Sequence, residues 1–269
     1  MGYVYPKFSK YDFLNIRIGG AGLGNLLFSY ARALLIEKKY GLKMIEPTWE
    51  SMKIGIYFRN EKEKRKYSQL LINNNSISGF KKLFVRLAYP VITEDEFNND
   101  KEANGKILEV FGNRDYFLPL LNERDFIRQK LISNINPIYI DKLKGFDGEC
   151  IGVHIRMGDF VEFDKQRLKP FVNMRLPLVW YILVINHIRQ LYGRNIHVNV
   201  FTDAHENQIR EILNLKNCSL VHFGTPISDM LALSRCKLMI GSASTFSMWA
   251  NYLGQNHAVW YSGDRKSVV

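Results

Sequence analysis

The sequence predicts an α/β protein with parallel sheets flanked by helices, and two observations predict it. The chain opens with a strand, a glycine loop, a helix and a second strand, and strand and helix patterns then alternate four times between residues 150 and 260. Such alternation is typical of parallel sheets covered by helices. A chain of 269 residues has the length of one large domain or two modest ones. We expect two α/β units, residues 1–145 and a Rossmann-like unit of residues 146–269.

Each element follows from hydrophobic spacing and local stop signals. Leu27, Ala31 and Leu34 recur at helical spacing, and Gly41 follows as a stop signal. The first unit is thus expected to contain a strand over 13–18, a loop over 19–24, a helix over 25–40, a strand over 43–45, and helices and loops over 60–145. The second unit is expected to contain strands over 150–153, 196–201, 219–223, 237–240 and 258–260, and helices over 177–191, 206–213, 228–236 and 245–253.

The composition is that of an ordinary globular protein, with 46% hydrophobic and 23% charged residues. It excludes a disordered chain, a collagen-like fibre and a disulfide-stapled miniprotein. The longest apolar run, 176–185, is shorter than the roughly 20 residues that span a bilayer, and the N-terminus has no apolar signal segment, so we expect a cytoplasmic protein. The three cysteines lack C-x-x-C spacing, which predicts reduced thiols rather than zinc ligands or disulfides.

Positive charge is concentrated in the first half of a chain whose net charge is +11. Residues 1–144 contain 24 Lys and Arg against 16 Asp and Glu. Two interpretations of the basic run stay open: a solvated surface, or a peripheral tether to an anionic membrane with apolar anchors. The residues concerned are Lys62, Lys64, Arg65, Lys66, Lys81, Lys82 and Arg86, with Leu83, Phe84 and Leu87 as the anchors. Nothing resembles a helix-turn-helix, a zinc finger or an RNP motif, so we expect no nucleic-acid partner.

The glycine loop brings Gly20, Gly22 and Gly24 to the start of the first helix. Backbone amides in such a loop approach a phosphate, assisted by the helix dipole. The loop departs from the dinucleotide pattern G-x-G-x-x-G because residue 25 is Asn, although Glu46 lies at the distance of a ribose-binding acid. A sugar or nucleotide site, a structural turn and a dinucleotide oxidoreductase stay open, in that order of preference.

A second candidate site follows the strand over 150–153, where the chain reads H-I-R-M-G-D over 154–159. Ligands of open parallel sheets bind at the carboxyl ends of the strands. The planar fork of Arg156 suits a diphosphate, because it donates two hydrogen bonds and never loses its charge. Asp159 is expected to hold Arg156, and His154 to meet a base or a ribose. The alternative is an Arg156–Asp159 pair that only builds structure.

The third candidate is the turn over 241–247, which follows a strand and precedes a helix. Its Ser and Thr residues are typical of helix caps, and the same amides and hydroxyls also bind phosphate. Upstream, Asp229 lies near another helix start, either as a cap or as an acceptor for the edge of a guanine.

Taken together, these residues resemble the bacterial α-1,2-fucosyltransferases, glycosyltransferase family 11. The opening G-G-L-G-N-Q-L-F of that family is similar to residues 22–28, its H-x-R-R-x-D to 154–159, its S-D-A to 202–204, and its closing M-S-x-C and S-T-F-S-W-W to 233–236 and 244–249. These motifs occur in the order of the family, and residues 50–145 carry no match.

The resemblance implies a GT-B-like fold of two Rossmann-like domains, the first on the acceptor side and the second binding a nucleotide sugar. It implies a GDP-fucose donor and inversion at the sugar carbon. The product is then an α-1,2 linkage to a glycan, in some relatives lipid-linked, in surface polysaccharide or O-antigen synthesis. The residue roles that it implies are the β-phosphate contact for Arg156, guanine binding for His154 and Asp229, a phosphate cradle for Ser244, Thr245, Phe246 and Ser247, the donor site for Asp159, Asp203, Gly22 and Gly24, and the reacting centre for Asn25.

Two positions depart from the family pattern. Met157 stands in place of a second Arg and Leu26 in place of a Gln, so we expect weaker donor electrostatics or a different nucleotide sugar. A non-catalytic relative that binds a nucleotide or a glycan is the other alternative. The sequence contains no D-x-D metal motif. We therefore expect no metal and no cofactor, with Arg156 and helix-start amides stabilising the departing diphosphate.

Overall fold

The computed structural model describes residues 2–13, 15–52, 67, 70–73, 75–97, 103–158, 160, 174–193 and 195–261. These residues form two compact units that divide between Asn136 and Pro137. The division precedes the expected boundary because the short helix α5 (Pro137–Asp141) packs against α8 (Pro226–Arg235) of the second unit. The residues around the expected boundary, 142–148, therefore lie inside the second unit.

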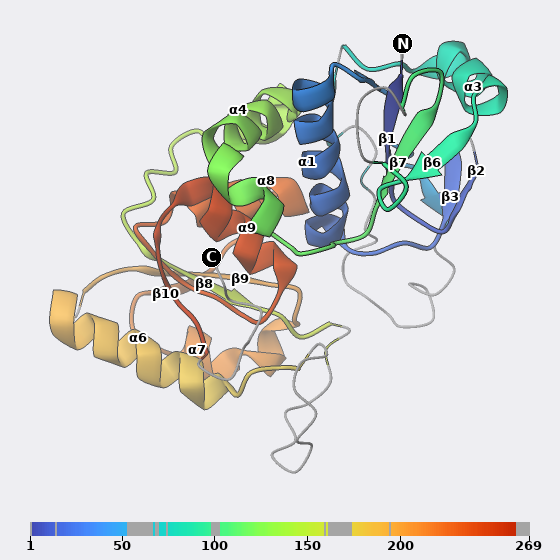
Figure 1. The fold of residues 1–269 in the computed structure, drawn as a ribbon. Helices are drawn as coiled ribbons and strands as arrows, with labels where there is room; N and C mark the ends of the chain where they lie inside the picture. Colours follow the sequence, from blue (N-terminus) through green and yellow to red (C-terminus); the bar gives the residue numbers. More distant parts are fainter. Residues whose placement is uncertain are drawn as a thin grey trace. The chain divides into compact units, whose positions relative to one another are not determined.

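The first unit is built on a four-stranded parallel sheet of order β4-β1-β7-β6. Its strands are β1 (Tyr3–Lys7), β4 (Lys43–Met44), β6 (Val91–Thr93) and β7 (Ile107–Phe111). Helix α1 (Leu23–Tyr40) lies on one side of the sheet and α3 (Gly79–Ala88) on the other (Figure 1). The 3-10 helix η1 (Leu118–Glu123) and α4 (Arg124–Asn134) pack against α1. A smaller sheet joins β2 (Tyr11–Phe13), β3 (Ile16–Ile18) and β5 (Ser51–Met52).

The opening of this unit is confirmed in part. Helix α1 and strand β4 lie where the spacing predicts them. The strand expected over 13–18 is confirmed only over 16–18, which is β3; Phe13 ends β2, and the two strands form an antiparallel pair in which Tyr11 faces Ile18. Strand β1 was not expected, and its fourth residue, Pro6, is of a type that is unusual inside a sheet. Strands β6 and β7 add sheet to a stretch where helices and loops were expected.

Helix α3 turns two of its basic side chains inward, which corrects the expected membrane tether. The buried Lys82 ammonium donates to Thr48 Oγ1 at 3.1 Å, and burial lowers the pKa of Lys82 to about 8. Arg86 pairs at 3.2 Å with Asp12, whose carboxylate is fully buried. Lys82 and Arg86 therefore stabilise the interior of the first unit. The remaining tether candidates are the exposed Lys81, and Lys62, Lys64, Arg65 and Lys66, which lie outside the described residues.

The second unit is a five-stranded parallel sheet of order β10-β9-β8-β11-β12. Its strands are β8 (Ile151–Ile155), β9 (Val198–Thr202), β10 (Cys218–Leu220), β11 (Leu238–Ile240) and β12 (His257–Val259). Helices α6 (Leu178–Tyr192) and α7 (Arg210–Leu213) lie on one side of the sheet, and α8 and α9 (Thr245–Gly254) on the other (Figure 1). Each expected strand and helix is present; the helix over 206–213 is divided into η2 (Glu206–Gln208) and α7.

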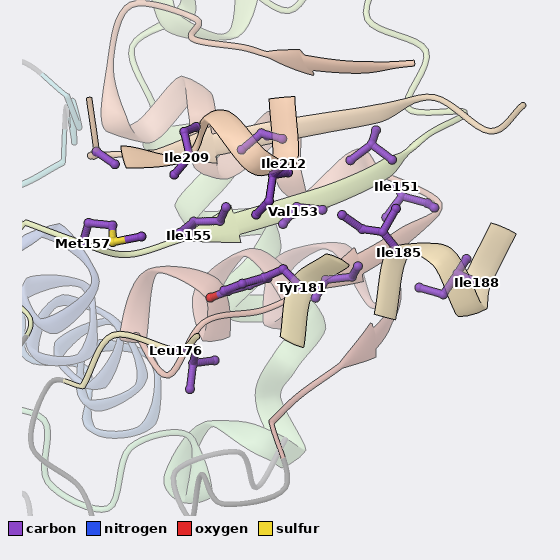
Figure 2. Packing of buried hydrophobic residues seen from close by; sticks show 14 residues of the cluster. Ile151, Val153, Ile155, Met157, Leu176, Tyr181, Ile185, Ile188, Ile209 and Ile212 are labelled. Carbon is purple, nitrogen blue, oxygen red and sulfur yellow. The ribbon is translucent and has the colours of Figure 1, made fainter. Parts of the chain in front are cut away.

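The central strand β8 alternates its side chains between the two faces of this sheet. Ile151, Val153 and Ile155 pack with Tyr181 and Ile185 of α6 (Figure 2). The residue between Val153 and Ile155, His154, faces α9 instead. Strand β8 runs two residues past its expected end, so this histidine belongs to the strand and not to the loop.

Candidate functional site

The carboxylate of Asp203 organises the loop that follows β8. Asp203 comes directly after β9, which pairs with β8 over its whole length. Its Oδ1 accepts the Met157 amide at 2.8 Å, and its Oδ2 accepts the Gly158 amide at 3.1 Å. A Cβ atom at residue 158 would collide with Oδ2, so the approach requires glycine. One carboxylate therefore fixes the first turn of the loop.

The same carboxylate holds Arg156, whose Nη1 lies 2.9 Å from Asp203 Oδ2. The Arg156 guanidinium also lies over the Phe160 ring, with 5.5 Å between its carbon and the centroid. Its side chain is 21% exposed, so a fixed cation reaches solvent at the carboxyl end of the central strand. The expected holder of Arg156 was Asp159. In the described part of the chain this role belongs to Asp203, and Asp159 lies outside it.

Met157, which stands in place of a second Arg of the motif, is a core residue. Its side chain is 8% exposed and belongs to the hydrophobic cluster that includes Val153 and Ile155 of β8 (Figure 2). Its carbonyl accepts a hydrogen bond from Arg175 Nε at 2.9 Å. Sequence reasoning missed Arg175, which lies 19 residues after Arg156 and carries no motif. The available signal was a basic residue directly before Leu176 and Pro177, which precede α6.

The His154 side chain is buried on the side of the sheet that α9 covers. Its Nδ1 lies 2.8 Å from Ser242 Oγ and 2.6 Å from Ser247 Oγ, and its ring stacks on Phe246 with 4.7 Å between centroids. Burial lowers the pKa of His154 to about 3; the Asp203 carboxylate opposes this shift. The imidazole is therefore neutral at pH 7 and contributes hydrogen bonds instead of charge.

Helix α9 begins at this cluster. Ser244 is its N-cap, with a hydroxyl that accepts the Ser247 amide at 3.4 Å, and the Ser247 hydroxyl accepts the Ser242 amide at 3.2 Å. The hydroxyl of Ser244 therefore serves as the helix cap, one of the two interpretations left open, and the hydroxyl of Ser247 ties the helix to the preceding turn. Thr245 lies in the first turn, where the helix dipole favours an anion. The helix start is tied to β8 through His154.

Asp229 anchors the loop before α8. The N-cap of α8 is Thr225, so Asp229 is not the cap. Its Oδ1 accepts the Phe223 amide at 2.6 Å, and its Oδ2 lies 2.6 Å from Nδ1 of His222. Burial raises the pKa of Asp229, and the Phe223 amide and His222 oppose that shift. Sequence reasoning missed His222, which is 55% exposed, so the group presented to solvent here is an imidazole held by a carboxylate.

The glycine loop of the first unit is held by a buried arginine. Arg17 donates from Nη1 to the Gly19 carbonyl at 2.6 Å and from Nε to the Thr48 carbonyl at 2.9 Å. Gly20 has φ 105°, and a Cβ atom there would collide with Arg17 Nη1. Gly22 is the N-cap of α1 and Gly24 lies inside the helix, so the loop ends earlier than expected.

A hollow of about 500 Å³ opens beside the glycine loop, within the first unit. Its polar lining includes Lys7, Lys10, Ser29, Asn113 and Asn25. The Oδ1 atom of Asn25 is buried and has no hydrogen-bond partner in the part of the chain that the structure describes. An unpaired buried acceptor costs free energy, so a ligand hydroxyl or amide that reached it would be stabilised.

Three further expectations concern metal ligands, membrane-spanning helices and the cysteines. Among the described residues, no cluster of three His, Cys, Asp or Glu side chains is arranged to hold a metal ion. No described helix has the length and apolar character needed to cross a membrane. Cys150, Cys218 and Cys236 are free thiols, as expected.

Comparison with known proteins decides the family. The model of glycosyl transferase family 11 matches residues 21–262. The chain belongs to this family. Its relative WbnK of Escherichia coli, an O-antigen biosynthesis glycosyltransferase, is 24% identical over 297 residues, which cover 92% of this chain and 95% of WbnK. This family 11 chain is therefore a glycosyltransferase.

Solved structures share its fold. The NodZ α-1,6-fucosyltransferase co-crystallised with GDP has a TM-score of 0.58 at 14% identity, covering 93% of this chain and 91% of that one. NodZ from Bradyrhizobium has a TM-score of 0.57 at 14% identity, covering 97% and 96%. POFUT1 in complex with GDP has a TM-score of 0.54 at 12% identity, covering 97% and 98%. The α/β fold of the family 11 chain is thus of the GT-B type, as the resemblance implied.

Proposed function

We propose that this family 11 glycosyltransferase transfers L-fucose from GDP-fucose to a hydroxyl of a glycan, with inversion and an α-1,2 linkage, in surface polysaccharide or O-antigen synthesis. Structures of NodZ soaked with GDP-fucose and of POFUT1 with GDP-fucose support the donor, and WbnK supports the O-antigen role. The observation that carries the proposal is a cation, Arg156, fixed by Asp203 at the carboxyl end of the central strand β8.

The second unit binds the donor in this proposal. Negative charge builds on the diphosphate as the sugar leaves, and a donor fixed in advance stabilises that charge without reorganisation. Arg156 takes this role, together with the amides at the start of α9. One such donor is typically worth about 3–4 kcal/mol of barrier. Neutral His154 acts through the helix: its bonds to Ser242 and Ser247 fix the start of α9.

The first unit takes the acceptor. In the hollow beside the glycine loop, Oδ1 of Asn25, which has no partner among the described residues, accepts a hydrogen bond from a sugar hydroxyl. An amide oxygen is a hydrogen-bond acceptor and not a proton carrier near pH 7, so Asn25 positions the acceptor and does not deprotonate it. Lys10 gives the same hollow a basic group, whereas Lys7, also in its lining, is paired with Glu109 at 2.7 Å.

A panel of nucleotide sugars tests this function. Hydrolysis and transfer are measured with GDP-fucose, other GDP-sugars and UDP-sugars, with and without EDTA. We expect turnover of GDP-fucose that EDTA leaves unchanged, because guanidinium groups supply the positive charge. Turnover of another nucleotide sugar alone would replace the donor, and binding without turnover would favour the non-catalytic alternative. Activity lost in EDTA and restored by magnesium or manganese would contradict the metal-free proposal.

We also propose a peripheral contact with an anionic membrane through the outer face of α3, which would keep the enzyme at the inner face. This face exposes Phe80 by 90%, Phe84 by 67% and Leu87 by 75%, with the exposed Lys81 beside them. Such a mixture suits an interfacial helix that inserts apolar side chains beside anionic headgroups.

Co-sedimentation with anionic and neutral vesicles tests this contact. Replacing Phe80 and Phe84 by Ser should abolish binding to anionic vesicles. Replacing the exposed Leu183 and Leu191 of α6 by Ser is the matched control and should not change it. Equal binding of anionic vesicles by both variants, or no binding by the wild type at low salt, would contradict the proposed membrane contact.

A further inference from the structure

The net positive charge at the end of β8 is smaller than its arginine suggests. Arg156 forms an ion pair with Asp203 across 2.9 Å, so the two formal charges cancel. His154 is neutral at pH 7, because burial lowers its pKa to about 3. A nucleoside diphosphate is strongly anionic, and its attraction to a site depends on the net charge there. A second cation at this loop would add net positive charge to what Arg156 and the α9 amides provide.

Arg175 brings a second guanidinium to the same loop. Its Nε donates to the Met157 carbonyl at 2.9 Å, and its Nη2 donates to the Gly158 carbonyl at 3.4 Å. These are the two residues whose amides Asp203 accepts. The turn is therefore held by a carboxylate through its amides and by a guanidinium through its carbonyls.

The charge of Arg175 is not cancelled by these contacts. Carbonyl oxygens carry no formal charge, and among the described residues no carboxylate pairs with Arg175. A guanidinium has five N–H donors in a rigid fork, so it can brace the loop and still donate to a phosphate. The side chain is partly exposed, which leaves it accessible to an anion.

We infer that Arg175 is a second donor-binding cation, which recognises the diphosphate of the nucleotide sugar and braces the turn that carries Arg156. The inference rests on the proposed function, because it takes a diphosphate as the ligand. It also bears on Met157, which stands in place of a second Arg of the motif. The side chain of Met157 is buried in the core, and Arg175 brings the cation to the backbone of that residue instead.

Calorimetry with GDP, GMP and guanosine tests the inference on the full chain. Arg175→Gln keeps an N–H donor for the carbonyls and removes the charge, whereas Arg175→Lys keeps the charge and removes the fork. We expect Arg175→Gln to weaken GDP binding by at least about tenfold while guanosine binding stays within about twofold. The salt dependence of GDP binding should also become shallower. Arg210→Gln, at an exposed arginine of α7, is the matched control and should bind like the wild type.

Each outcome of the calorimetry either supports or overturns the inference about Arg175. Unchanged GDP affinity in Arg175→Gln, or equal losses for GDP and guanosine, would overturn the inference and leave Arg175 a structural residue. If Arg175→Gln does not fold, Arg175→Lys decides by the same comparison: a loss selective for GDP supports the inference and equal changes overturn it. A wild type that binds no GDP would instead refute the proposed function, so the two failures are distinguishable.

Discussion

Nη1 of Arg156 lies 2.9 Å from Oδ2 of Asp203, and the two residues follow the neighbouring strands β8 and β9. The same carboxylate accepts the amides of Met157 and Gly158. One side chain therefore fixes both a cation and the loop that carries it. Electrostatic catalysis requires this kind of rigidity before the ligand arrives, because no energy is then spent on reorganisation.

Asp203→Asn should reduce donor turnover while the protein stays folded. Asparagine replaces one of the two acceptor oxygens by a donor, which cannot accept from the loop amides or pair with Arg156. A misplaced cation of this kind typically costs about 100-fold in rate, so we expect kcat/KM for the donor to fall by about that factor. Glu206→Gln, at an exposed carboxylate of η2, is the control. Equal activity in both variants would show that Asp203 does not position Arg156.

His154 should make the stability of the protein depend on pH. Its pKa falls from 6.5 to about 3 on folding, mainly through burial, so the unfolded chain binds the proton more readily than the native state does. The stability that neutral His154 contributes is complete above pH 6.5 and is lost as the pH falls toward 3. Between these limits the free energy of unfolding should drop by up to about 1.4 kcal/mol per pH unit.

Urea unfolding between pH 6.5 and pH 4 measures this slope. His154→Asn should show a shallower decline than the wild type, because asparagine does not titrate. His187→Gln, at an exposed histidine of α6, should keep the slope of the wild type. Parallel curves for His154→Asn and the wild type would mean that His154 binds a proton as readily in the native state as in the unfolded chain.

Arg86→Met should destabilise the first unit strongly. It removes the cation that pairs with the fully buried carboxylate of Asp12, and also a donor to the Tyr5 hydroxyl at 3.3 Å. Breaking a buried ion pair by removing one partner typically costs about 3–5 kcal/mol. Lys81→Met, on the exposed side of the same helix, should change the free energy of unfolding by less than about 0.5 kcal/mol. Thermal or urea unfolding compares the two, and similar small effects would show that Arg86 is a surface residue after all.

The second unit could be predicted from the sequence because buried parallel strands read as short apolar runs between helical patterns. The end of β8 could not, because His154 interrupts the apolar run, and its burial depends on hydroxyls about 90 residues later, Ser242 and Ser247. The first unit was harder to predict from the sequence. Its β1 contains a proline, and the stretch over 60–145 carries no clear period.

The partner of Arg156 could not be predicted for a related reason. Sequence proximity favours Asp159, whereas the pairing of β8 with β9 brings Asp203 to the same place from residues far along the chain. Lysine is expected at a surface, whereas Lys82 is buried and donates to the distant Thr48. Arg175 likewise reaches its site through backbone carbonyls, which leave no signature in the sequence.

Transfer from GDP-fucose by Arg156→Ala tests the central claim most directly. We expect Arg156→Ala to lose nearly all transfer with an unchanged melting temperature, and Arg156→Lys to recover little, because an ammonium lacks the two-pronged fork. Activity of Arg156→Ala within about tenfold of the wild type, a loss of only about 1.4 kcal/mol of transition-state stabilisation, would contradict the account.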